Sequence, residues 1–229
     1  MKLLEHFKTF LADQVDLNQT RVDQLDSSVL AVQTAIKDSG WKAPIIEFSA
    51  HGSWAHGTII RPLPDKEFDA DLLAIVNPVD GWEAKDYVNT LYAALEQNAI
   101  YKEKLRRYSH CVTIEYAGVR RIDIAPVVRD RWVPGWDEVC NRTTNEFERS
   151  TPTEYTKWVV EKNTIAGGND LRKVTRLLKY LRDIKGNFTC PSFLLTTLLG
   201  YRVQESDKYA DTFPDTPTTL KCLLGRLDD

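Results

Sequence analysis

The sequence has 229 residues, a mass of 26.2 kDa and a formal net charge of −3 at pH 7. A chain of this length can bury a substantial hydrophobic core, and its charged start and lack of a long apolar run argue against a signal peptide or a membrane-spanning segment. The slightly negative charge also argues against a long nucleic-acid template as an obligate partner.

The first part of the chain is expected to form helical structure followed by two strands. Apolar residues recur every three to four positions over residues 3–39, which predicts one long helix, or two helices broken near residues 16–20. Residues 45–49 predict a first strand that leads directly into Gly52-Ser53. Residues 69–76 predict a second strand, and residues 82–99 predict an amphipathic helix.

The second predicted strand opens with Asp69-Ala70-Asp71. Because alternate residues of a strand face the same way, we expect Asp69 and Asp71 to project from one side and Ala70 from the other. Two neighbouring carboxylates repel each other unless a cation lies between them, and their hard oxygen atoms suit Mg²⁺ or Mn²⁺. The pattern therefore predicts a metal site that handles phosphate.

A third carboxylate is expected beside this pair. Residues 110–128 predict a β-hairpin with its turn at residues 117–118. In the second strand of the hairpin, Asp123 lies between two isoleucines, so it is expected to face away from the buried side. If this strand lies beside the strand with the acidic pair, all three carboxylates meet. The alternative is that Asp123 pairs with Arg121 or Arg120 on a solvated face.

The rest of the chain is expected to be a polar connection over residues 129–148, followed by helices. Helical periodicity covers residues 155–162, 170–185, 192–202 and the chain from 217 onward, and Asn169 or Asp170 would cap the second of these helices. We therefore predict an α+β fold with its active site in a cleft between two parts. Residues 1–150 would form a catalytic core, made of the long N-terminal helix and a mixed sheet. Residues 151–229 would form a helical lobe that is truncated at its C-terminus.

The four cysteines are widely spaced and form no CxxC pair or Cys/His cluster. Reduced thiols in a cytoplasmic protein are the simplest interpretation, and no zinc site is expected.

These motifs resemble those of a known enzyme superfamily. Gly52-Ser53, the Asp69-x-Asp71 pair and the distant Asp123 resemble the signature of polymerase-β-like nucleotidyltransferases. The run Gly-Ser-x-x-x-Gly-Thr-Ile-Ile-Arg-Pro-Leu, which leads into Phe-Asp-Ala-Asp-Leu-Leu, is similar to the cGAS-like and oligoadenylate-synthase-like branch. Within that branch it most resembles the bacterial cyclic-oligonucleotide synthases of anti-phage defence, the CD-NTases. The similarity extends from about residue 45 to the end of the sequence, and the chain lacks the His/Cys zinc insert of animal cGAS.

The resemblance implies an enzyme that makes a cyclic di- or trinucleotide from ATP or other NTPs and releases pyrophosphate, with two Mg²⁺ or Mn²⁺ ions as cofactors. Asp69, Asp71 and Asp123 would bind the metal ions and act as the catalytic residues. Gly52 and Ser53 would hold the triphosphate. Taken without the resemblance, Gly52-Ser53 could equally be a turn before a short helix.

The resemblance also implies three nucleotide contacts from the helical lobe. Lys179 and Ser192 would bind phosphate, and Phe193 would stack on the base. Taken alone, the basic stripe that contains Lys179 would be a solvated helix face, and Phe193 could belong to the core of its helix. The residues that flank the Gly-Ser pair are interpreted as loop residues: His51, His56 and Arg61.

Two other functions remain open. The chain could transfer a nucleotide to another acceptor, such as a linear oligonucleotide, an RNA end or a protein hydroxyl, or it could be a nucleotide-binding regulator without catalysis. The sequence does not reveal base choice, ring size or linkage. It also leaves open whether a regulatory protein partner, a peptide or the loss of an inhibitor switches activity on.

Overall fold

The computed structural model describes residues 2–64, 66–116, 120–186 and 188–228, and the chain forms two compact units. The sheet unit comprises Thr20–His51 and Glu67–Thr153. The helical unit comprises the N-terminal segment up to Gln19, Gly52–Lys66 and the chain from Glu154 onward. Both units are therefore assembled from segments that are distant in sequence, and the linear division at residue 150 stays a prediction.

The sheet unit confirms the mixed sheet that the sequence predicts. Within the described residues, seven strands join in the order β1-β2-β5-β4-β3, with β6 paired to β5 and β7. β2 and β5 run parallel, and the other paired strands run antiparallel. The strands are β1 Ile45–His51, β2 Phe68–Val76, β3 Leu105–Arg107, β4 Val112–Tyr116, β5 Arg120–Arg129, β6 Asp137–Asn141 and β7 Glu146–Ser150. The helices α2 Gln19–Asp38 and α4 Ala84–Glu96 belong to this unit, apart from Gln19.

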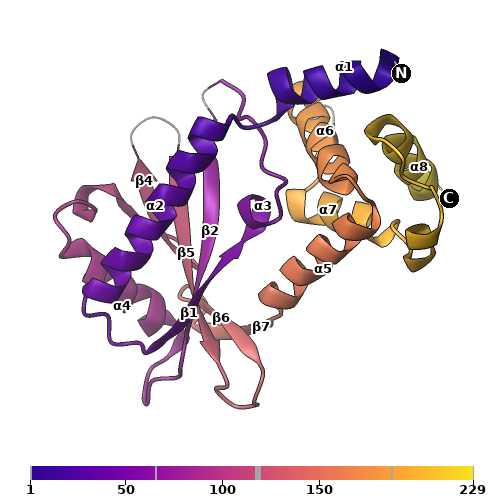
Figure 1. Ribbon diagram of the computed structural model, residues 1–229. Helices are drawn as coiled ribbons and strands as arrows, with labels where there is room; N and C mark the ends of the chain where they lie inside the picture. The colour runs from indigo at the N-terminus through magenta and orange to yellow at the C-terminus, as the bar shows by residue number, and fades with distance from the viewer. Residues whose placement is uncertain (1, 65, 117–119, 187, 229) are drawn as a thin grey trace. The chain divides into compact units, whose positions relative to one another are not determined.

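Alternation along β2 separates a buried face of the sheet from a polar face. Phe68 and Ala70 are buried, whereas Asp69 and Asp71 are partly exposed. α2 covers the buried face, because the guanidinium carbon of Arg21 lies 5.8 Å from the centroid of the Phe68 ring. Figure 1 shows α2 running along the sheet. The predicted placement of the two aspartates opposite Ala70 is thus confirmed.

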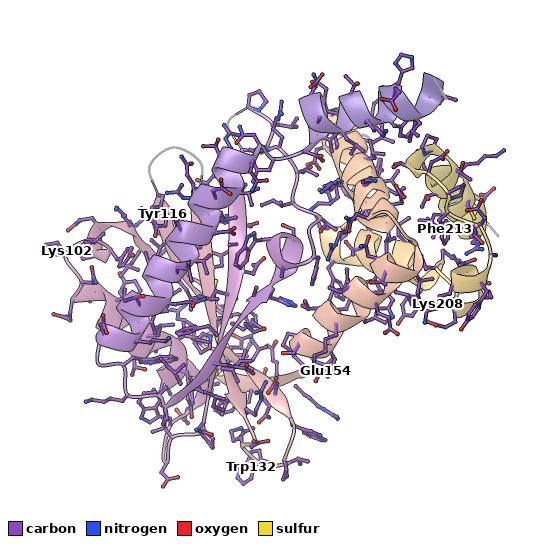
Figure 2. The ribbon with its side chains drawn as sticks, in the orientation of Figure 1. Lys102, Tyr116, Trp132, Glu154, Lys208 and Phe213 are labelled. Atoms are coloured by element: carbon purple, nitrogen blue, oxygen red, sulfur yellow. The ribbon has the colours of Figure 1, made fainter. Side chains whose placement is uncertain are left out.

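The helical unit packs its helices around one apolar core. α1 Lys2–Phe10 continues into a π-helical turn, Leu11–Val15, before α2 begins, so the helical segment is broken as one of the two predictions had it. The other α-helices are α3 Gly52–Ala55, α5 Pro152–Ile165, whose first two residues belong to the sheet unit, α6 Asp170–Lys185, α7 Ser192–Tyr201 and α8 Thr216–Asp228. The buried core consists of Ile165, Ala166, Leu171, Val174, Leu195, Leu199, Val203, Phe213 and Leu223. Phe213, labelled in Figure 2, packs in this core near the guanidinium of Arg226.

One prediction about local structure is wrong, and a second is confirmed only in position. Residues 129–148 were expected to be a connection, but they contain β6 and the start of β7, which form because β6 extends the sheet through pairs such as Val127 with Val139. Asn169, one of the two predicted candidates, is the N-cap residue of α6, but its side chain makes no capping hydrogen bond. The side-chain oxygen Oδ1 of Asn169 instead accepts a hydrogen bond from the side-chain amide of Asn163 at 3.0 Å. The predicted hairpin turn at residues 117–118 lies outside the described residues.

Among the helices that the structure describes, none is long and apolar enough to cross a membrane.

Candidate active site

A row of polar side chains crosses the polar face of the sheet. Asp71 of β2 pairs in register with Asp123 of β5, and Asp123 pairs on its other side with Thr113 of β4. Register partners on neighbouring strands point to the same face, and the strands lie about 4.8 Å apart. Two residues earlier on the same strands, Asp69 pairs in register with Arg121. The structure therefore brings the three predicted acids together on one face of two adjacent strands.

Asp123 is held in place by a buried threonine. The Thr113 hydroxyl donates a hydrogen bond to Asp123 Oδ1 at 2.5 Å, and Thr113 is completely buried. The Asp123 side chain is only 19% exposed. Burial raises the pKa of Asp123, and the Thr113 hydrogen bond and the Arg121 charge oppose this rise without cancelling it. This carboxylate therefore depends on its neighbours to stay ionised and correctly oriented.

Arg121 lies between two of the acids. Its Nη2 donates a hydrogen bond to Asp69 Oδ2 at 2.9 Å, and its Nε lies 3.6 Å from Asp123 Oδ2. Burial alone would lower the pKa of Arg121, but the charge of Asp123 and the interactions with Asp69 outweigh burial and raise it. The ion pair of Asp123 with Arg121, the alternative from the sequence, is thus present together with the acidic cluster.

The three acids suit a hard divalent cation in their chemistry and in their common face. Yet in the portion of the chain that the structure describes, no three His, Cys, Asp or Glu side chains are gathered closely enough to hold a metal ion. The guanidinium of Arg121 takes the place of a cation on Asp69 and Asp123. The donor set therefore fits Mg²⁺ or Mn²⁺ in the chemistry of its oxygen atoms and in its common face, while its side chains are gathered around an arginine and not around a metal position.

A thiol and an apolar cluster border the acids. Cys111 Sγ lies 3.8 Å from Thr113 Oγ1, and burial raises the pKa of Cys111 to about 11, with the nearby Asp123 charge adding to the rise. Cys111 therefore stays a neutral thiol at physiological pH. Further along β2 and β5, the same face becomes apolar through Leu73, Ile75 and Val127. Sequence reasoning missed Cys111 and Thr113, because the turn predicted at residues 117–118 would pair Asp123 with Val112, whereas the structure pairs Asp123 with Thr113.

In the helical unit, Gly52 and Ser53 begin the short helix α3. Gly52 has a φ of 65°, a conformation that glycine adopts without strain. Its carbonyl accepts a hydrogen bond from the His56 amide at 3.0 Å, and the Ser53 carbonyl accepts one from the Thr58 amide at 2.9 Å. The segment is thus a short helix closed by a tight loop, and its phosphate-binding role stays a prediction.

The residues that flank this segment have structural contacts. His51 is the last residue of β1 and pairs in register with Asp71, so its interpretation as a loop residue is wrong. His56 is buried, and its Nε2 lies 3.1 Å from the Thr156 hydroxyl. Arg61 donates to the backbone carbonyl of Asp13.

The three nucleotide contacts predicted from the helical lobe also lie in the helical unit. Lys179 is buried, and its Nζ donates to the Thr58 carbonyl at 2.8 Å, which fastens α6 to the loop after α3. Ser192 accepts a hydrogen bond from Arg182 at 3.2 Å. Phe193 is 63% exposed and its ring centroid lies 4.8 Å from that of Tyr155, so it does not belong to the core of its helix. The roles of Lys179, Ser192 and Phe193 in nucleotide binding stay predictions.

Comparison with known proteins shows which family the sequence of this chain matches. The family model described as Second Messenger Oligonucleotide or Dinucleotide Synthetase domain matches residues 1–163. A c-di-GMP synthase from Roseivirga ehrenbergii is 22% identical over 249 residues, which cover 95% of this chain and 65% of that protein. The chain therefore spans about two thirds of the length of this curated relative.

Solved structures with the same fold include two bacterial proteins with bound nucleotides. CdnC from E. coli MS115-1, solved with ATP, has a TM-score of 0.76 at 18% identity, and the superposition covers 98% of this chain and 71% of the CdnC chain. The cyclic AMP-GMP synthase DncV from Vibrio cholerae, solved with nonhydrolyzable GTP, has a TM-score of 0.76 at 16% identity, and the superposition covers 98% of this chain and 78% of the DncV chain. These likenesses establish the fold.

Proposed function

Since this chain belongs to the Second Messenger Oligonucleotide or Dinucleotide Synthetase family, we propose that it is a template-independent nucleotidyltransferase that makes a cyclic di- or trinucleotide from NTPs. The relatives support this class of product, because one is named a c-di-GMP synthase and another a cyclic AMP-GMP synthase.

The observation that carries the proposal is the register between β2 and β5. It sets Asp71 beside Asp123 and Asp69 one step away, on the face that α2 leaves uncovered. Three carboxylates side by side repel one another, so such a cluster is costly unless cations are part of its function.

The reaction proposed for these acids is an in-line displacement on an α-phosphate. The oxygen of a ribose hydroxyl forms a bond to the α-phosphorus of an NTP, the bond between the α-phosphorus and the bridging oxygen breaks, and pyrophosphate leaves with the electron pair. Asp69, Asp71 and Asp123 would hold two Mg²⁺ or Mn²⁺ ions, which supply positive charge for the phosphates and lower the pKa of the attacking hydroxyl. Asp123 would orient that hydroxyl or accept its proton.

The helical unit would bind the nucleotide. Gly52 allows a close approach of its backbone to the triphosphate, and Ser53 would donate to the phosphate oxygens. Lys179 and Ser192 would bind phosphate, and Phe193 would stack on the base. The exposed ring of Phe193 supports a stacking role, because an aromatic face in contact with solvent is available to a ligand.

The biological setting is proposed from the family alone. We expect a cytoplasmic enzyme in bacterial anti-phage defence whose product acts on an effector. A regulatory protein partner is supported by a relative, since CdnC from E. coli MS115-1 has been solved as a CdnC:HORMA-deltaN complex.

A direct assay tests the proposal. The purified chain is incubated with all four radiolabelled NTPs and Mg²⁺ or Mn²⁺, and the products are treated with phosphatase. We expect a phosphatase-resistant cyclic product that disappears in Asp71→Asn and persists in the control Asp80→Asn, since Asp80 is exposed after the end of β2. Linear product or labelled protein would favour another acceptor. Nucleotide binding without turnover would favour a non-catalytic regulator.

A further inference from the structure

The acidic site contains a cation of its own. Arg121 contacts two of the three acids that the proposed function assigns to metal binding, with distances of 2.9 Å to Asp69 and 3.6 Å to Asp123. Glu67, which does not belong to these three acids, places its Oε2 3.7 Å from Arg121 Nη1. The guanidinium therefore neutralises part of a negative cluster that would otherwise repel itself.

The grip of Arg121 on the acids is incomplete. Its Nη2 makes a normal hydrogen bond to Asp69, whereas its Nε is buried and has no hydrogen-bond acceptor, and the contact of Nε with Asp123 is electrostatic only. A fully engaged arginine would bind a carboxylate through two parallel hydrogen bonds. Because Arg121 holds neither acid in this way, its release would break fewer charge-assisted hydrogen bonds than release from a bidentate pair.

The neighbouring arginine has different contacts. Arg120 lies over the ring of Tyr116, 4.7 Å from its centroid, and donates to Gln24 Oε1 at 3.4 Å. Tyr116 is labelled in Figure 2. Since successive residues of a strand face opposite sides, Arg120 is a matched control for Arg121 with the same charge on the same strand.

We propose that Arg121 is an exchangeable counter-ion of the acidic site, which holds Asp69 and Asp123 together in the metal-free protein and gives way when a divalent cation binds. Arg121 thereby sets the affinity of the site for metal. This inference rests on the proposed metal-binding role of the acids. It explains why three carboxylates are adjacent while the described residues do not form a closed metal site.

Direct binding of Mn²⁺ to the nucleotide-free chain tests the proposal. Free Mn²⁺ is measured by electron paramagnetic resonance for the wild type, Arg121→Gln and Arg120→Gln. We expect Arg121→Gln to bind Mn²⁺ about tenfold more tightly, because one partly screened positive charge no longer competes with and repels the ion. Arg120→Gln should stay within about twofold of the wild type, because Arg120 alternates with Arg121 along β5 and its side chain faces away from the acids.

Thermal unfolding gives a second readout. Without metal, Arg121→Gln should melt at a lower temperature than the wild type, and Mn²⁺ should raise its melting temperature by more than it raises that of the wild type. Unchanged or weaker Mn²⁺ binding by Arg121→Gln would overturn the proposal, because a merely structural arginine would support the ligands and its loss would loosen the site.

Two further measurements cover the case in which Arg121→Gln does not fold. Arg121→Lys keeps the charge but cannot span both acids, so it should bind Mn²⁺ with an affinity between those expected for wild type and glutamine variant. In the wild-type chain, the NMR signal of Arg121 Nε–H should shift when Mg²⁺ is added, and an unmoved signal at saturating Mg²⁺ overturns the proposal.

The outcomes separate this inference from the proposed function. A wild-type chain that makes cyclic product while Arg121→Gln binds Mn²⁺ no more tightly refutes the inference alone. A chain that makes no product but shows the expected order of Mn²⁺ affinities supports the inference and refutes the proposed function. If neither protein binds Mn²⁺, the counter-ion role is refuted.

Discussion

Replacing Thr113 by valine removes one hydroxyl group and nearly preserves the shape of the side chain. Thr113 is completely buried on β4, and its hydroxyl donates to Asp123 Oδ1 at 2.5 Å. Since Thr113 would touch neither substrate nor metal, it is a positioning residue for the proposed catalytic acid. The variant therefore isolates the contribution of orientation and local charge stabilisation at Asp123.

The size of the effect follows from the charge of the acceptor. A hydrogen bond to an ionised group contributes about 1.5–3 kcal/mol, and each 1.4 kcal/mol of transition-state stabilisation corresponds to about a tenfold change in rate. If the bond is fully expressed in the reaction, Thr113→Val should lower kcat/KM by about 10- to 100-fold at saturating metal. The free energy of unfolding should fall by less, about 1 kcal/mol, because water can reach the partly exposed carboxylate.

The assay is cyclic-product formation by wild type, Thr113→Val and Thr113→Ser, since serine keeps the hydroxyl and should recover most of the activity. A second measurement follows the Asp123 carboxyl by ¹³C NMR in the metal-free protein. The Thr113 hydrogen bond lowers the pKa of Asp123, so its removal should raise that pKa further. A valine variant with wild-type kcat/KM and an unchanged carboxyl pKa would show that this hydrogen bond has no influence on the acid.

Three other predictions concern single side chains. Asp71→Asn should lower the rate of cyclic-product formation more than about thousandfold with either Mg²⁺ or Mn²⁺, because the three acids would act as a unit and the loss of one would abolish most of the rate. A variant that keeps a third of the rate would contradict this. Asp207→Asn should lower the free energy of unfolding in urea by about 2–4 kcal/mol, since Asp207 is buried and Arg226 binds both of its oxygens at 2.8 Å. The hydrogen bond from Arg226 depresses the pKa of Asp207. The stabilisation is therefore present above the usual carboxyl pKa and is lost as the pH falls through the depressed pKa. The difference in free energy of unfolding between wild type and variant should persist at pH 7 and vanish in strong acid. Gly200→Ala should lower the free energy of unfolding by about 1–3 kcal/mol, because a Cβ there would lie 2.5 Å from the Trp158 ring; an unchanged melting temperature would mean that the ring moves freely.

The positions of the acids could be predicted from sequence because strand alternation is a local property. Asp69 and Asp71 are separated from Ala70 by the pleat alone, and Asp123 is placed by its isoleucine neighbours. Whether the two strands adjoin, and in which register, depends on pairing between segments about fifty residues apart in the sequence. The parallel pairing of Asp71 with Asp123 was therefore a condition of the prediction that only the structure could supply.

β6 and β7 show where local patterns fail. β7 has the sequence Glu-Phe-Glu-Arg-Ser and lies at an end of the sheet, where charged side chains prevent pairing with other chains. A strand of this kind carries little hydrophobic periodicity, so its sequence resembles a loop. It becomes a strand because the backbone N–H and C=O groups of β6 pair with its own, as where Cys140 lies opposite Phe147. Such a strand is determined by its neighbour more than by its own residues.

Arg121 illustrates the same dependence at the candidate site. The spacing Arg121-x-Asp123 places both side chains on one face, and this suggested an ion pair along β5 as an alternative to catalysis. The register with β2 adds Asp69 as a second partner, which changes the meaning of the arginine. An arginine shared between two strands can balance an acidic cluster while no metal is bound, whereas an arginine confined to one carboxylate cannot. An ion pair and a metal site are therefore compatible interpretations of the same residues, because the first describes the cluster before the cation arrives and the second describes it afterwards.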